Sequence, residues 1–118
     1  MKYILIGKQC VYLDTIKERM SREDKEILCI NKPTIFSNAE SKIIYIKASI
    51  PYSWEYWMGS DINNEDNLKR FVDEIMDFRE LDEEKCHLIL DYSGTGLLSI
   101  TEKIREFIDQ CESESENQ

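Results

Sequence analysis

The stretch KIIYIKA, residues 42–48, is the clearest indication of the fold in this sequence. Its β-branched and aromatic residues are bounded by polar ones, a pattern typical of a β-strand. Two short apolar runs precede it, at residues 3–7 (YILIG) and 26–31 (EILCIN), and a fourth follows at residues 86–92 (CHLILDY). We therefore expect four strands.

Apolar residues at helical spacing lie between and after these strands. Residues 11–20 form the first such pattern, with apolar positions at Leu13, Ile16 and Met20. A second helix is capped by Asn63 or Asn64, and its predicted inward face holds Leu68, Phe71, Val72, Ile75 and Met76. A last helix carries the capping-box pair Ser99 and Glu102, and its predicted inward face holds Ile100, Ile104, Phe107 and Cys111.

The element order β-α-β-β-α-β-α predicts a single layered α/β domain over residues 1–111, followed by a disordered acidic tail at 112–118. The strands at 3–7 and 86–92 lack alternation, which predicts central positions covered on both faces. The second and third strands are separated by only ten residues, which is short for a helical crossover. The four-stranded sheet is therefore either mostly parallel or mixed, with those two strands antiparallel.

Charge is distributed unevenly along the chain. Residues 1–60 hold nine Lys and Arg against seven Asp and Glu, whereas residues 61–118 hold six against seventeen. A field of that sign repels nucleic acid and anionic membranes and favours a basic protein partner. We expect neither nucleic-acid nor membrane binding.

Cysteine and histidine usage argues against metal binding and secretion. The four cysteines are far apart in sequence and form no C-x-x-C pair, and His87 is the only histidine, expected at a partly exposed strand edge. The apolar run at the N-terminus is too short for a signal-peptide core and is interrupted by Lys8. We expect free thiols in a cytoplasmic protein with no metal and no cofactor.

A glycine-containing turn follows the fourth predicted strand. It comprises Asp91, Ser93, Gly94, Thr95 and Gly96, and backbone N–H groups of such a turn before a helix can hold an anion. LILDYSGTG resembles the first motif of haloacid-dehalogenase-type phosphotransferases, which implies a nucleophilic role for Asp91. The turn also resembles that of CRISPR-associated ring-nucleotide sensor domains and the metal-binding motif of von Willebrand type A domains. In the simpler interpretation, the glycines make a tight turn and Asp91 or Ser93 caps the helix.

Aromatic residues are concentrated at residues 51–60 (PYSWEYWMGS), which we interpret as a loop or a short helix. Tyrosine and tryptophan side chains at a surface often anchor protein interfaces. The densest acidic run follows at residues 73–84. Together the two segments predict a partner-binding surface formed by Trp54, Glu55, Tyr56, Trp57, Asp73, Glu74, Asp77, Glu80, Asp82, Glu83 and Glu84. In a simpler interpretation, the aromatic side chains pack in the core and the acids are a solvated helix face.

In size, charge and this predicted aromatic and acidic surface, the chain resembles small acidic immunity proteins of bacterial contact-dependent and other polymorphic toxin systems. The resemblance implies a non-enzymatic protein that neutralises a basic, nuclease-like toxin by occluding its active site. Two alternatives remain: a small nucleotide- or phosphate-binding module, either a sensor or phosphotransferase-like, that uses the Asp91–Gly96 turn, and a phage anti-defence protein.

Overall fold

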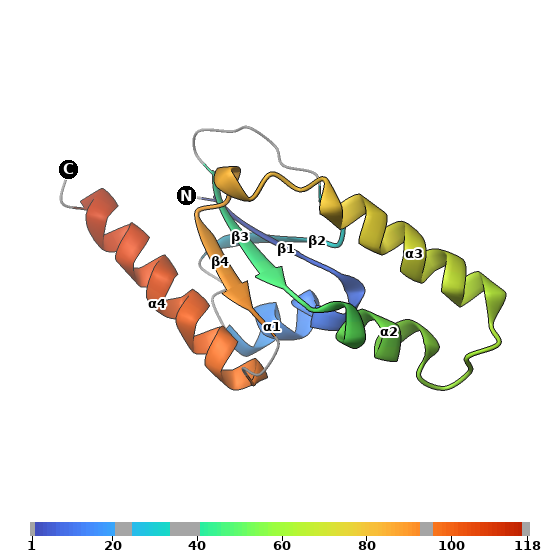
Figure 1. The fold of residues 1–118 in the computed structure, drawn as a ribbon. Coiled ribbons are helices and arrows are strands. Elements are labelled where there is room, and N and C mark those ends of the chain that lie inside the picture. Colours follow the sequence, from blue (N-terminus) through green and yellow to red (C-terminus); the bar gives the residue numbers. More distant parts are fainter. Residues whose placement is uncertain (1, 21–24, 34–40, 93–95, 117–118) are drawn as a thin grey trace.

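The computed structural model describes residues 2–20, 25–33, 41–92 and 96–116 (Figure 1). In chain order, its elements are β1 (Lys2–Gly7), η1 (Gln9–Val11), α1 (Leu13–Met20), β2 (Glu26–Ile30), β3 (Ser41–Lys47), α2 (Ile50–Met58), α3 (Glu65–Arg79), η2 (Glu83–Lys85), β4 (Leu88–Asp91) and α4 (Leu97–Glu116), where η denotes a 3₁₀ helix. The predicted alternation of strands and helices is confirmed, and the aromatic segment forms the helix α2.

The four strands form one parallel sheet in the order β2-β1-β3-β4. The layered α/β prediction is confirmed, and β2 and β3 are not an antiparallel pair, because β1 lies between them. The prediction that the first strand is central is correct, whereas the fourth strand lies at an edge. β4 has only four residues, and they alternate between half-buried and exposed. The apolar run in the sequence did not reveal that alternation.

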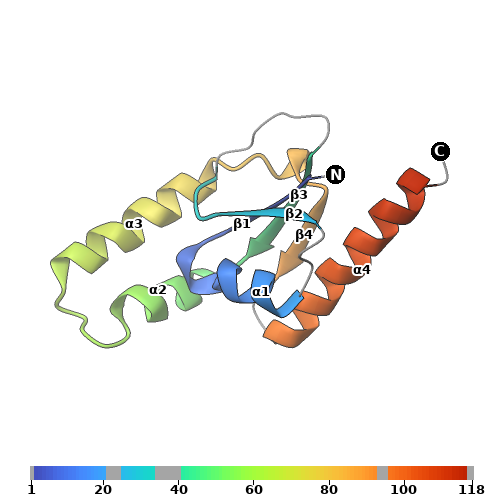
Figure 2. The ribbon, with the colours of Figure 1, turned by 180° about the vertical axis from the view of Figure 1, so that it is seen from behind.

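The two faces of the sheet are covered differently (Figures 1 and 2). On one face, Tyr3 and Leu5 of β1 and Ile44 of β3 belong to the main core with α1 and α4. On the opposite face, a smaller cluster joins Ile4, Ile6, Ile43 and Tyr45 to Phe78 and Leu81. Since successive residues of a strand point to opposite faces, even-numbered positions of β1 face α3.

Helix α3 meets the sheet only through its C-terminal end. Its N-terminal part extends with α2 beyond the carboxyl edge of the sheet (Figure 1), so the molecule measures 55 × 28 × 22 Å. The prediction of which residues of α3 face inward is therefore largely wrong. Phe71 is buried as predicted, but Leu68, Val72 and Met76 are exposed, and Glu74 and Phe78 are buried instead. The predicted cap is Asn64, whose side chain accepts a bond from Asn67 N at 3.1 Å.

Helix α4 is longer than predicted. It begins at Leu97, which places Ser99 inside the helix rather than at its cap, and it continues to Glu116. Ile100, Ile104 and Ile108 are fully buried against the sheet. Beyond the predicted end at Cys111, Glu112 Oε1 accepts a hydrogen bond from Tyr3 Oη at 2.8 Å, and Glu112 Oε2 lies 3.4 Å from Lys25 Nζ. These bonds tie the start of the predicted acidic tail to the sheet, and residues 117–118 lie outside the described part.

His87 extends the pairing of β3 with β4 through its side chain. Its backbone N–H donates to Ile43 O at 2.8 Å, and its Nδ1 accepts from Ile43 N at 2.9 Å. Burial, together with nearby Lys42, lowers the pKa of His87 below its usual value. Because Nδ1 must be unprotonated to accept this bond, folding favours the neutral ring.

We predict that protonation of His87 destabilises the fold. A lowered folded-state pKa contributes stability that is present above the pKa of the unfolded state and is lost as the pH falls. The free energy of unfolding, measured with urea, should therefore fall between about pH 7.5 and about pH 5.5. His87→Asn supplies an acceptor that does not titrate, so its unfolding free energy should change less over the same interval. An equal pH dependence in both proteins would contradict the assignment.

Candidate functional site

The carboxyl edge of the sheet is where this fold brings loops together. The chain leaves β1 toward α1 on one face and leaves the neighbouring β3 toward α2 and α3 on the other. Such a reversal between adjacent parallel strands opens a crevice, and ligands of α/β folds bind there. Side chains from η1, α2 and α3 meet at this point.

The carboxylate of Glu74 organises this region. The residue is only 9% exposed, and its two oxygens accept three hydrogen bonds. Gln9 N donates at 3.0 Å, Trp57 Nε1 at 3.1 Å and Ser53 Oγ at 3.3 Å. The bonds connect α3 to both η1 and α2. Glu74 therefore acts within the fold and is not part of an exposed acidic surface.

The aromatic residues of α2 are divided between packing and exposure. Trp57 is half-buried, and its ring contacts that of Tyr56 edge to face at 4.9 Å. The exposed ring of Trp54 lies edge to face against Phe71 at 5.2 Å, which joins α2 to α3. Tyr56 is exposed and contacts Tyr12 at 5.8 Å. Each ring packs on a neighbouring ring, and two of the three predicted anchors, Trp54 and Tyr56, remain accessible.

The remaining predicted acidic residues are all exposed. Glu55 lies on α2. Asp66, Asp73 and Asp77 of α3 and its C-cap residue, Glu80, lie on one outward stripe. The others follow in and before η2, where Asp82 Oδ1 accepts from Glu84 N at 3.1 Å and Glu83 pairs with Lys47 at 2.8 Å. The structure therefore gathers Asp73, Asp77 and Glu80 on one helix surface and sets Asp82, Glu83 and Glu84 beyond its end.

In addition to its buried face, α3 carries an exposed apolar stripe beside the acidic one. Leu68, Val72 and Met76 are spaced four residues apart and are 41%, 46% and 54% exposed. At 3.6 residues per turn, these positions lie between the buried face of the helix and its acidic stripe. Their helical spacing is visible in the sequence, where it predicts that they face the core. The structure shows instead that they are exposed.

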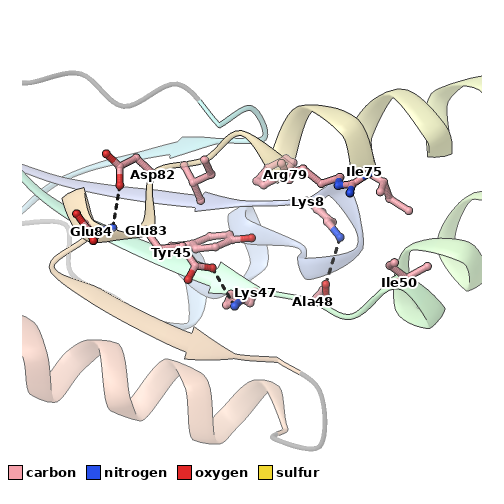
Figure 3. Close-up of a pocket in the computed structure, with 12 residues that line it drawn as sticks. Lys8, Tyr45, Lys47, Ala48, Ile50, Ile75, Arg79, Asp82, Glu83 and Glu84 are labelled. Carbon is pink, nitrogen blue, oxygen red and sulfur yellow. Dashed lines mark hydrogen bonds and ion pairs between the residues drawn. The ribbon is translucent and has the colours of Figure 1, made fainter.

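A groove of about 830 Å³ lies between α3 and the sheet (Figure 3). Its floor includes Tyr45 and Lys47 of β3, and its far wall includes Ile75 and Arg79 of α3. Lys8 lines its carboxyl end and is only 7% exposed. In the sequence, Lys8 stands out only as the residue that interrupts an apolar run. The alternation of Ile4, Ile6 and Lys8 was the signal that this lysine points to the same face.

The predicted anion-binding turn is only partly described. Asp91 is exposed at the carboxyl end of β4, and the exposed Gly96 accepts a bond from Ile100 N at 3.1 Å. Ser93, Gly94 and Thr95 lie outside the described residues. Because β4 is an edge strand, Asp91 at its carboxyl end is not at the crevice between β1 and β3.

The thiols and carboxylates show no metal-binding arrangement within the described residues. All four cysteines are free, and burial raises the pKa of Cys29 to about 11. No group of three or more His, Cys, Asp or Glu side chains in the described ranges is arranged to hold a metal ion. None of the described helices is both long and apolar enough to cross a membrane.

Comparison with known proteins gives no relative from which a function could be transferred. No protein-family model, no curated protein and no solved structure matches the chain significantly.

We predict that Glu74 is a main determinant of the position of α3. Glu74→Ala removes the acceptor of three donors, on the buried Ser53, the half-buried Trp57 and the backbone of Gln9, and should lower the free energy of unfolding by about 2–4 kcal/mol. Asp73→Ala removes the same charge from a neighbouring exposed position and should change the free energy of unfolding by less than about 0.5 kcal/mol. Chemical denaturation of both variants measures the difference. Equal effects would mean that the buried bonds contribute little.

Proposed function

We propose that this chain is a non-enzymatic binding protein that captures a basic protein through the outward surface of α3. The supporting observation is the exposed apolar stripe of Leu68, Val72 and Met76, which runs beside an acidic stripe on the same helix. An amphipathic surface helix ordinarily buries its apolar residues in its own core. Here α3 has a buried face and a further apolar stripe that stays 41–54% exposed.

The two stripes suit different parts of an interface. Apolar side chains contribute affinity when a partner removes them from water. The carboxylates of Asp73, Asp77 and Glu80 attract a basic partner at a distance and accelerate its encounter with the protein. Trp54 packs on Phe71 next to this surface and offers a rigid ring to the same partner. The acids after α3 extend the negative field.

We infer further that the partner is a basic bacterial toxin domain of nuclease type, and that the chain acts as its immunity protein in the cytoplasm. A nuclease presents a positively charged groove to its anionic substrate, so an acidic helix that occupies the groove blocks the substrate. A phage protein that inhibits a nucleic-acid-binding defence protein would use the same surface. The gene next to the one encoding this chain distinguishes them: a toxin gene supports immunity, and a prophage supports anti-defence.

The proposal predicts separate effects of charge and of apolar contact on binding to the basic protein captured from the native organism. Asp73→Lys with Asp77→Lys should lower the association rate at least about tenfold at low salt and abolish most of its salt dependence. Leu68→Gln with Val72→Gln and Met76→Gln should mainly raise the dissociation rate. Surface plasmon resonance across a range of salt concentrations measures both rates.

The matched control is Glu102→Lys with Glu106→Lys, which makes the same charge change at exposed positions of α4. Its net charge equals that of the double α3 variant, so any difference between the binding rates of the two variants comes from the position of the substitutions. If the two double variants behave alike, or if the glutamine variant binds like the original chain, the α3 surface is not the binding site.

A further inference from the structure

We propose that the groove between α3 and the sheet binds a small organic phosphate of mononucleotide size, with its phosphate held by Lys8 beside the start of α2. This ligand site is separate from the outward surface of α3. The groove lies under the opposite side of the helix, next to Ile75 and Phe78. A negative result for one proposal therefore does not contradict the other.

The Lys8 ammonium group is the first argument. Lys8 is 7% exposed and lines the groove at the end of the central strand β1. Its Nζ donates to Ala48 O at 3.2 Å, and no carboxylate in the described chain lies within ion-pair distance of it. An ammonium group has three donors, and burying its charge without a counter-ion is costly. An anionic ligand would supply both a counter-charge and an acceptor.

Glu74 does not fill that role. It is the one buried carboxylate among the described residues, but its oxygens already accept from Gln9, Ser53 and Trp57. Lys47, the other lysine of the groove, pairs with Glu83 at 2.8 Å. Lys8 and Arg79 are therefore the groove cations that have no carboxylate partner in the described residues, and of these two only Lys8 is buried.

The start of α2 adds positive potential at the same place. Lys8 Nζ bonds to Ala48 O, and Ala48 directly precedes Ser49, the N-cap of this nine-residue helix. Ile50 of the first turn lines the groove. The N-terminus of a helix attracts anions through its backbone dipoles and N–H groups. Here it lies beside a buried cation at the crevice that α/β folds use for ligands.

Tyr45 gives the groove a third anion-binding group. Its ring stacks on Phe78 at 6.1 Å, and Figure 3 shows its hydroxyl directed along the groove toward Lys8. Burial raises the pKa of Tyr45 to about 12, with a further contribution from Glu83, so the hydroxyl keeps its proton at neutral pH. It can therefore donate a hydrogen bond to a phosphate oxygen.

The opposite end of the groove favours ligand groups that donate hydrogen bonds. Figure 3 places Asp82, Glu83 and Glu84 at the end away from Lys8. Their carboxylates accept from hydroxyl or amino groups and repel a second anion. Ile50 and Ile75 provide apolar contact between the two ends. At about 830 Å³ the groove is within the usual range for small-molecule sites. A mononucleotide has this order of groups: a phosphate, a ribose with hydroxyl groups, and a base that carries an amino group in AMP, GMP and CMP.

Isothermal titration calorimetry on the full chain tests the proposal, with AMP, GMP, CMP, UMP and inorganic phosphate as probes and adenosine as the uncharged control. We expect at least one mononucleotide to bind, inorganic phosphate to bind more weakly and adenosine not to bind. Lys8→Gln keeps a donor for Ala48 O but removes the charge, and should weaken binding at least about tenfold. Lys103→Gln, a matched loss of an exposed lysine on α4, should bind as the original chain does.

Three results would overturn the proposal: no binding of any phosphate probe at millimolar concentration, equal binding of adenosine and AMP, or unchanged affinity in Lys8→Gln. If Lys8→Gln does not fold, Tyr45→Phe provides a second test, because it removes only the hydroxyl and should still weaken phosphate binding. Asp73→Lys with Asp77→Lys should bind the mononucleotide normally, which separates this site from the protein-binding surface.

Discussion

The buried carboxylate of Glu74 is the interaction on which the arrangement of this molecule depends. By accepting hydrogen bonds from η1 and α2, it holds α3 against α2 rather than flat across the sheet. Only the C-terminal end of α3 then reaches the sheet, through Phe78. Two features follow from this position. An apolar stripe on α3 stays in solvent, and a groove remains open between the helix and the sheet.

These two features have opposite electrostatic character. The outward surface of α3 is acidic and suits a basic macromolecule, whereas the carboxyl end of the groove holds Lys8 and the start of α2 and suits an anion. Because α3 separates the two, a negative protein surface and a positive internal site coexist within one small domain. Net charge alone describes only the first of them.

The sequence predicted the elements of the fold but not which face of a helix is buried. Strand and helix positions follow from local periodicity, so the layered α/β fold could be predicted, while the choice between a parallel and a mixed sheet and between Asn63 and Asn64 as the cap stayed open. Leu68, Val72 and Met76 were assigned to the core, because periodicity cannot reveal that the neighbouring surface is α2 rather than the sheet. Glu74 was assigned to the surface for the related reason that a carboxylate is buried only where donors converge, and these donors come from distant segments. Lys8 could have been found, since it continues the alternation of Ile4 and Ile6.

The central claim is that the exposed surface of α3 binds a basic protein. Amide hydrogen exchange tests this claim most directly. Exchange should be measured by mass spectrometry on the full chain, alone and bound to the basic protein captured from the native organism. The account predicts slower exchange on binding over residues 65–84, with little change over residues 97–111 of α4. Protection of α4 or α1 with no change over residues 65–84 would contradict it.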